Sequence, residues 1–392
     1  MSAASSSTST RPPLWRDAKV LRWVGQVVVL ALVLALLYWI YGNVQANLRI
    51  TRLPRGFGFL DQPYGSDIRG NPFRPSQSVW DAFKVGYFNT LRVIAVGIPA
   101  CTIIGIFIGI ARLSENALVR AFGTVYVETF RNIPVLVWIF LAYFVVLSGN
   151  LPQINDALEP FGIAVFSNRG IYLPWYETGP NITPFLITAG LGLLVAVLVA
   201  AWRTRVNERT GQPHRRVLWG LFTLLVVAGV GFVVFDSPLS GTVPAREGRL
   251  VEGGITVDIA YAGLTVALVL YTASHVAEIV RGAIQAVPKG QSEAANALAL
   301  TNFQRYRFVV LPQAFRIMIP PLASQYLNIT KNSSLAVAVG YYEITRVYST
   351  VANNAAPPVQ AVVILMGLYL TFSLGISLVA NVINRRLQLE SR

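Results

Sequence analysis

Repeated apolar runs of bilayer length constrain the fold of this chain more than any other feature of its sequence. A spanning helix needs roughly 20 predominantly apolar residues. Lipid offers the backbone no hydrogen-bond partners, so only helices or closed barrels cross a membrane. The sequence therefore predicts an all-α integral membrane protein with about eight transmembrane helices. The predicted spans are Val24–Tyr41, Thr90–Ala111, Thr124–Leu147, Phe185–Trp202, Val217–Phe235, Val257–Val280, Phe308–Leu327 and Val359–Val382.

Positive charge is concentrated in the loops between these runs. The formal net charge is +14, but arginines between apolar runs act as topology signals and do not indicate nucleic-acid binding. Basic loops stay on the cytoplasmic side, which predicts cytoplasmic amino and carboxyl termini. The groups that agree are Arg11, Arg16, Lys19 and Arg22, then Arg112 and Arg120, then Arg203, Arg205, Arg209, Arg215 and Arg216, and finally Arg385 and Arg386. One basic group disagrees, because its loop is predicted outside: Arg49, Arg52, Arg55, Arg69 and Arg74.

The amino-terminal region and the single cysteine add few constraints. Cys101 lies within an apolar run, which predicts helix packing and excludes a disulfide framework or a thiol metal site. The first run follows basic residues and precedes Val44-Gln45-Ala46, which imitates a secretory cleavage site. Its length and aromatic end favour an uncleaved anchor. Residues 1–22 are predicted to form a disordered cytoplasmic tail.

A polar, basic segment, Glu278–Pro312, lies between two late apolar runs. Pro288 and Gly290 break the preceding span. Ser292 is predicted to cap a new helix with Glu293 in its first turn, where the helix dipole favours a negative charge. The alanines that follow would let this helix lie deep in a groove on a partner. The alternative is an ordinary interfacial helix in which alanine only favours helix formation. The predicted apolar anchors are Leu298 and Leu300.

Glu293-Ala294-Ala295, followed at fixed distance by Leu311-Pro312, resembles the EAA signature of binding-protein-dependent ABC importer permeases. That family usually has glycine where this chain has Ala299. Alanine in a left-handed conformation costs roughly 1 kcal/mol, so the helix is expected to run a residue or two longer. By this resemblance the segment couples to an ATPase through Gly290, Glu293, Ala294, Ala295, Ala299, Leu311 and Pro312.

Two further stretches resemble the polar amino-acid (histidine/glutamate/glutamine) subfamily. They read TVYVETFRNIPVLVWIFLAYF and NITKNSSLAVAVGYYEI. The resemblance implies a type I importer core of five helices, with an extra amino-terminal helix and an inserted helix pair. This enlarged architecture is most similar to the Q-type permease subunit of general L-amino-acid ABC transporters. The expected segments are 1–22 (tail), 23–43 (extra helix), 44–82 (extracytoplasmic loop), 83–148 (core), 149–255 (insertion), 256–385 (core, with coupling loop 281–307) and 386–392 (tail).

Charged residues inside the third run are candidates for a substrate pathway. Glu128 and Arg131 lie in an apolar stretch, where a central charge costs roughly 2.5 to 3.5 kcal/mol. They are expected to face a cavity, the bundle or an interface. The alternative is a structural ion pair one turn apart. Pro134 removes one backbone hydrogen bond and either frees a carbonyl for a ligand or kinks the helix.

A second pathway candidate follows the seventh run. Its polar side chains suit the carboxylate and ammonium groups of a zwitterion. The alternative is that Lys331 and Asn332 lie at a membrane interface and cap a helix. These residues are Lys331, Asn332, Ser333 and Ser334. His275 is interpreted as a packed or interfacial residue more than as a proton relay. Arg281 with Glu278 is interpreted as a helix-end salt bridge.

The chain has no Gly-x-x-x-x-Gly-Lys-Ser/Thr phosphate loop, no catalytic constellation and no metal-ligand motif. It is therefore expected to bind no cofactor, and ATP and Mg²⁺ are expected on a partner ATPase. The resemblance implies three partners in a bacterial inner membrane: a paralogous permease forming a heterodimer, a nucleotide-binding ATPase dimer and a periplasmic amino-acid-binding protein. The alternatives are an ion-coupled secondary transporter that uses Glu128 or His275, and a membrane enzyme that acts on lipid.

Overall fold

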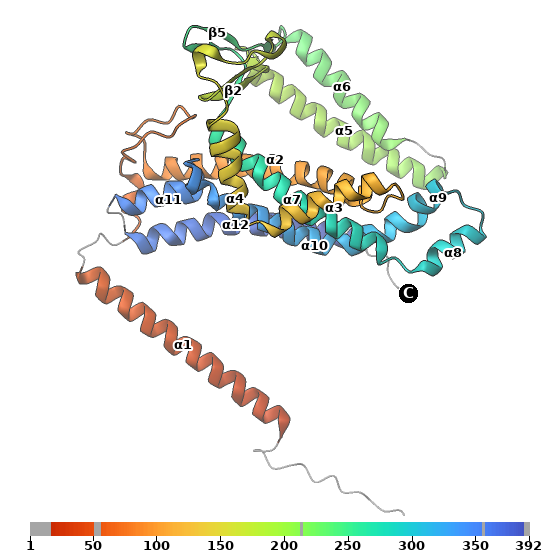
Figure 1. Ribbon diagram of the computed structural model, residues 1–392, viewed down its shortest axis with the longest axis horizontal. Helices are drawn as coiled ribbons and strands as arrows, with labels where there is room; N and C mark the ends of the chain where they lie inside the picture. Colours follow the sequence, from red (N-terminus) through yellow and green to blue (C-terminus); the bar gives the residue numbers. More distant parts are fainter. Residues whose placement is uncertain (1–16, 51–55, 212–214, 355–356, 388–392) are drawn as a thin grey trace, which may run out of the picture.

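The computed structural model describes residues 17–50, 56–211, 215–354 and 357–387. Four long helices form the main bundle (Figure 1): α2 (Val79–Ala111), α7 (Ile259–Gln285), α10 (Leu311–Asn332) and α12 (Pro358–Leu387). One end of the bundle carries α8 (Lys289–Ala297) and α9 (Asn302–Arg305), and the opposite end carries α11 (Ile344–Asn353). Residues 1–16 and 388–392 of the predicted tails lie outside the described residues. The last residues of the amino-terminal tail are helical, because α1 (Ala18–Ile50) begins there.

The predicted count of about eight membrane spans compares with six or seven apolar helices of that length in the described residues. Six helices of the described residues are long and apolar enough to cross a membrane, and a bent pair makes up to seven. The predicted span Phe308–Leu327 is occupied by α10, which does not reach that composition. α10 carries Gln313, Arg316 and two internal prolines, and it packs against α7 and α12. Neighbouring helices shelter these polar groups, so α10 is less apolar than a lipid-facing helix.

The predicted span Thr124–Leu147 is not one continuous helix, because the chain breaks in its middle. α3 (Ala117–Asn132) ends before Pro134, α4 (Val135–Phe140) begins after it, and the pair is bent by 103°. Ile133 has an extended backbone (φ −106°, ψ 133°), which is the conformation that a following proline imposes. A π-helical turn continues α4 to Ser148. Pro134 therefore marks a hinge between two helices.

Glycines allow α2 and α7 to approach closely at the centre of the bundle. A Cβ atom on Gly105 would lie 2.5 Å from Val276 Cβ, and one on Gly109 would lie 2.7 Å from the carbonyl oxygen of Ala277. Small residues four apart let two helix backbones come into contact in this way. Cys101 belongs to the same buried cluster, which confirms its predicted role in packing.

The extracytoplasmic loop of the prediction folds against the bundle end that carries α11. Tyr64 and Phe73 are buried, and their rings meet edge to face with centroids 5.6 Å apart. They belong to one apolar cluster with Phe83 of α2 and Val347 of α11. The basic side chains Arg69 and Arg74 of this loop are exposed. Burial of aromatic residues therefore packs the described part of this loop, residues 56–78, against the bundle.

The insertion consists of a helical hairpin and small antiparallel sheets. α5 (Ile182–Thr210) and α6 (Arg216–Val234) pack along each other beside the bundle (Figure 1), which confirms the predicted helix pair. Strands that were not predicted join the flanking loops, since Tyr172 pairs with Thr256 and Trp175 with Thr242. The sheets have the orders β1-β2-β7, β3-β4 and β5-β6. The strands are β1 (Val165–Ser167), β2 (Gly170–Leu173), β3 (Trp175–Thr178), β4 (Leu239–Thr242), β5 (Ala245–Glu247), β6 (Leu250–Glu252) and β7 (Ile255–Val257).

Candidate functional site

Residues 288–310 form a protruding knob at one end of the bundle, the α8–α9 knob (Figure 1). α8 begins at Lys289, directly after Pro288, whose backbone is not helical (φ −55°, ψ 134°). Proline fixes φ and lacks an N–H, so the chain leaves α7 here and starts a new helix at the next residue. Ser292 therefore lies inside α8, and the prediction that it caps the helix is wrong. Glu293 lies in the second turn instead of the first, and it is exposed.

Ala299 ends α8 in a left-handed conformation (φ +54°), so the predicted helix extension is wrong. The Ala299 N–H donates to the Asn296 carbonyl at 2.9 Å, and the Leu300 N–H donates to the Ala295 carbonyl at 3.1 Å. These two bonds form a Schellman motif, the usual termination by glycine. The motif satisfies two terminal carbonyls, and this gain outweighs the cost of roughly 1 kcal/mol for a left-handed alanine.

Within the knob, α9 leads into α10 without an intervening loop. Thr301 and Gln304 form a reciprocal capping box at its start, and a π-helical turn, Tyr306–Val310, continues it into α10. Gln313 of α10 donates to the Gln291 side chain of α8 at 3.1 Å. α8 is therefore linked to α10 through this hydrogen bond, and α9 runs into α10 as continuous helix.

The α8–α9 knob presents apolar side chains that nothing in the described residues covers. Leu298 is 76% exposed, Phe303 70% and Phe308 63%. Ala295 is buried and fixes α8 against the rest of the chain, whereas Leu300 is only half-buried. Exposed large apolar groups beside an acidic side chain are typical of an interaction surface. The remaining residues of the predicted coupling set are exposed, except for a half-buried Leu311: Gly290, Glu293, Ala294, Ala299 and Pro312.

The predicted ion pair between Glu128 and Arg131 does not form. Glu128 instead accepts a hydrogen bond from the Asn132 side-chain amide at 3.1 Å. Arg131 reaches α7, where its Nη1 lies 3.7 Å from Glu278 Oε2. Glu128 and Arg131 are both exposed at the surface of the described residues. Their predicted role in a substrate pathway stays a prediction.

Glu278 is the centre of a cluster of charges on three helices. It accepts hydrogen bonds from Arg281, which confirms the predicted salt bridge, and from Arg112 at the carboxyl end of α2. Arg131 of α3 is its third cationic neighbour. Sequence reasoning missed Arg112, which is distant along the chain and was interpreted as a topology signal only. The signal in the sequence was Glu278 itself, an acidic residue at the end of an apolar run that also carries an arginine.

The residues Lys331 to Ser334 lie where α10 gives way to a 3₁₀ turn, Ser333–Val339. The Ser333 hydroxyl is buried and donates to the Thr330 carbonyl at 2.7 Å. The Ser334 hydroxyl donates to the Lys331 carbonyl at 2.7 Å. Both hydroxyls thus already have acceptors within the helix end, while the Lys331 side chain is exposed. A role for Lys331 and Asn332 in substrate passage stays a prediction.

Glu343 is a fully buried carboxyl that sequence reasoning did not identify. It precedes α11, outside the membrane-spanning helices, and has 0% exposure. Tyr369 of α12 donates to it at 2.7 Å, and the Arg346 backbone N–H donates at 3.0 Å. Burial raises the pKa of Glu343 to about 7. An acidic residue directly after an apolar, small-residue stretch was the signal in the sequence.

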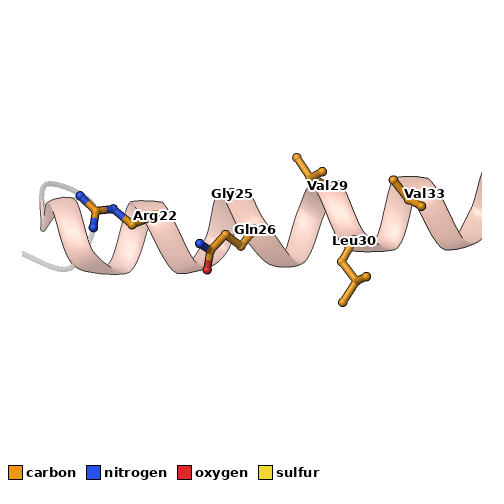
Figure 2. A pocket seen from close by; sticks show the side chains of 6 residues that line it. All are labelled: Arg22, Gly25, Gln26, Val29, Leu30 and Val33. Carbon is orange, nitrogen blue, oxygen red and sulfur yellow. The ribbon is translucent and has the colours of Figure 1, made fainter. Parts of the chain in front are cut away.

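No metal site is found among the described residues. They contain no group of three or more His, Cys, Asp or Glu side chains that could hold a metal ion. Figure 2 shows the residues that line one open surface pocket, and all of them lie on α1. A surface on one helix encloses no substrate. The residues lining it are Arg22, Gly25, Gln26, Val29, Leu30 and Val33.

Helices of membrane length around a broken span, with an exposed helical knob between two of them, define a multi-pass membrane transport subunit. Residues 102–389 match the family described as binding-protein-dependent transport system inner membrane component, and the chain belongs to this family. It is therefore a multi-pass permease of the inner membrane. The family supplies the membrane component of a transport system and not its catalytic subunit.

Relatives of similar length strengthen this assignment. The chain is 40% identical to the general L-amino acid transport system permease protein AapQ of Rhizobium johnstonii, with 94% of this chain and 92% of the relative covered. It is 38% identical to the putative amino-acid ABC transporter permease protein YhdX of Escherichia coli, with 94% and 95% covered.

A solved amino acid ABC transporter with histidines aligns at 18% identity and a TM-score of 0.46, covering 78% of this chain and 94% of that chain.

Proposed function

We propose that this chain is the permease subunit of an ATP-driven amino-acid importer, and that the α8–α9 knob is its contact with a separate ATPase. The observation that carries the proposal is the knob itself, which exposes Glu293, Leu298 and Phe303 in a member of a binding-protein-dependent family. A helix of small residues with apolar anchors fits a groove on a partner. ATP and Mg²⁺ would be bound by that partner, since this sequence has no phosphate loop.

The proposed substrates are L-amino acids. This proposal is supported by relatives named for the transport of general L-amino acids and of glutamate, glutamine, aspartate and asparagine. A periplasmic binding protein would deliver the substrate, and a paralogous permease would form the second half of the translocation unit. Both termini and the α8–α9 knob would lie in the cytoplasm, which agrees with the basic loops at Arg203–Arg216 and Arg385.

The proposed mechanism is alternating access. Closure of the ATPase dimer on ATP would displace α8, and the displacement would pass to α10 through α9 and through the bond between Gln291 and Gln313. α7 would move as well, because only Ala286 to Pro288 separate it from α8. A ligand shifts a conformational equilibrium only through contacts that differ between the two states. The knob provides such contacts if the ATPase groove changes shape with nucleotide.

The first test is purification of the chain from native membranes in mild detergent, followed by identification of its companions and an ATPase assay. The expected result is a nucleotide-binding ATPase that hydrolyses faster when an amino-acid-loaded receptor is added. Nothing in the comparisons favours the ion-coupled alternative. Uptake into vesicles that continues without ATP and stops when the ion gradient is collapsed would nevertheless establish it.

Glu293→Lys tests the knob directly. Reversal of the exposed charge is expected to reduce co-purification of the ATPase and uptake together by about tenfold, the effect of disrupting one strong interfacial charge contact. Glu247→Lys is the matched control, because Glu247 is equally exposed but lies in strand β5, far along the chain. Normal assembly and uptake with Glu293→Lys would show that the knob is not the contact with the ATPase.

A further inference from the structure

Three guanidinium groups converge on one carboxylate where α2, α3 and α7 meet. We call this set the Glu278 joint: Glu278 and Arg281 of α7, Arg112 at the end of α2 and Arg131 of α3. Glu278 Oε1 accepts from Arg281, Oε2 accepts from Arg112, and Arg131 Nη1 approaches Oε2 at 3.7 Å. Arg112 is the most buried of the three arginines, with 11% of its side chain exposed, and Arg131 is 40% exposed.

The three contacts differ in how much they add to the structure. α2 and α7 already interlock through Gly105 and Gly109, so Arg112 strengthens an interface that packing has formed. Arg281 and Glu278 are one turn apart on the same helix. Arg131 connects α3 to α7, and its contact with Glu278 is the longest of the three. A partly exposed ion pair at this distance is weak, so it can break and re-form.

The joint lies between the knob and the hinge. Arg131 occupies the last turn of α3, directly before the break at Ile133 and Pro134. Arg281 occupies the last turns of α7, whose end at Gln285 is followed by Pro288 and α8. Glu278 thus lies near the end of α7, which leads into α8. It also contacts the end of α3, which leads into the α3–α4 hinge.

α3 is otherwise attached to α7 at a point farther from the hinge. Tyr126 donates to the Leu270 carbonyl at 2.8 Å, and Gly123 packs so closely that a Cβ there would lie 2.8 Å from Arg112 Cγ. Phe130 and Trp138 stack across the break with centroids 4.3 Å apart. Loss of the Arg131 contact would therefore leave α3 attached and remove the ion pair that ties its last turn to α7.

We propose that the Glu278 joint is a positioning element that sets the α3–α4 hinge according to the position of α8. When α8 moves, the end of α7 carries Glu278 toward or away from Arg131, and the hinge follows. Two discrete arrangements of such a contact are what transmits coupling between distant parts of a protein. The inference rests on the proposed function, since it assigns the joint to the path between ATP hydrolysis and substrate passage.

The test uses the complete transport complex in proteoliposomes, with a radiolabelled mixture of L-amino acids as the probe. Uptake and ATP hydrolysis are measured in the same preparation for Arg131→Gln and for Arg120→Gln. Arg120 is the control, since it lies on the same helix and its guanidinium bonds only to the Ser114 and Glu115 carbonyls, at 2.8 and 3.2 Å. Arg131→Gln is expected to hydrolyse ATP but to lower uptake per ATP about tenfold.

Each outcome decides the matter. Uptake per ATP that is unchanged in Arg131→Gln, or lowered equally in Arg120→Gln, would overturn the proposal. A raised KM for the amino acids at unchanged uptake per ATP would mark Arg131 as a substrate ligand and would also overturn it. A wild-type complex without any ATPase would instead refute the proposed function, which separates the two failures.

A double-mutant cycle distinguishes positioning from a general structural role. If Arg131 acts through Glu278, adding Arg131→Gln to Glu278→Gln is expected to change uptake per ATP by less than about twofold. Losses that multiply would show that Arg131 acts through another group. Should Glu278→Gln fail to assemble, the comparison of Arg131→Gln with Arg120→Gln still supports or overturns the proposal by itself.

Discussion

α7 and α5 are both long enough to span a membrane, yet their surroundings are opposite. In its most apolar stretch α7 has 67% of its residues buried inside the chain, whereas α5 has 17%. α7 is also the less apolar of the two. Its buried hydroxyl groups, such as those of Thr272 and Ser274, are tolerated because neighbouring helices surround them, while a helix that faces lipid has to be apolar all round. Of these two helices, the more hydrophobic one is therefore the one that the core of the protein needs less.

Glycine substitutions offer the strongest way to break this comparison. Gly105→Leu is expected to lower the free energy of unfolding by roughly 3 kcal/mol, because its side chain has no space against Val276. Gly190→Leu on α5 is the matched control, since nothing lies within 4 Å of its Cβ position. It is expected not to destabilise the protein and to stabilise α5 by up to about 1 kcal/mol, because leucine favours helix more than glycine does. Unfolding of both variants in detergent measures the difference, and equal stability would refute the packing argument.

The buried carboxyl of Glu343 tests the same comparison between packed and lipid-facing regions, because it is an ionisable group inside the packed region. Its pKa, raised by burial to about 7, means that the folded state holds the proton more tightly than the unfolded state. Ionisation therefore destabilises the fold, and stability is expected to fall as pH rises from about 4.5 toward 7 and above.

Glu343→Gln removes this ionisation while keeping a similar shape beside Tyr369 and Thr345. The variant is expected to gain stability over the wild type at pH 8, by about 1 to 3 kcal/mol, and less at pH 5. Thermal unfolding at both pH values provides the measurement, with the exposed Glu247→Gln as the control. A gain that does not depend on pH would assign the effect to packing alone.

The smallest expected effect concerns the exposed α8–α9 knob, which belongs to neither packed nor lipid-facing surface. Ala299→Gly is expected to stabilise the end of α8 by about 1 kcal/mol, because glycine adopts a positive φ without steric cost. Ala294→Gly, inside the same helix, is expected to destabilise it by a similar amount. Hydrogen exchange of the Leu300 amide, which bonds to the Ala295 carbonyl, reports the local change. The same sign for both variants would contradict the left-handed termination.

Local patterns predicted the elements well where a single principle dominated. The bilayer-length runs, the inserted helix pair and the polar segment before α10 follow from hydropathy and proline placement, and the structure contains each of them. The errors arose where two local rules competed. The position of Pro288 outweighed the capping preference of Ser292, and two hydrogen bonds outweighed the steric cost at Ala299. In the third run, the kink that Pro134 allowed for is a full break of the helix at Ile133.

The sequence by itself determined that this chain crosses a membrane and which segment projects from it, because both depend on neighbouring residues. Only the tertiary structure decided which helices are buried and which partner each charge has. Arg131 was matched with Glu128 along the helix, but the fold places it beside Glu278 of another helix. A helix offers a side chain only a few neighbours along its own sequence, whereas packing adds neighbours from any part of the chain. The contacts of Glu278 and the burial of Glu343 are of this second kind.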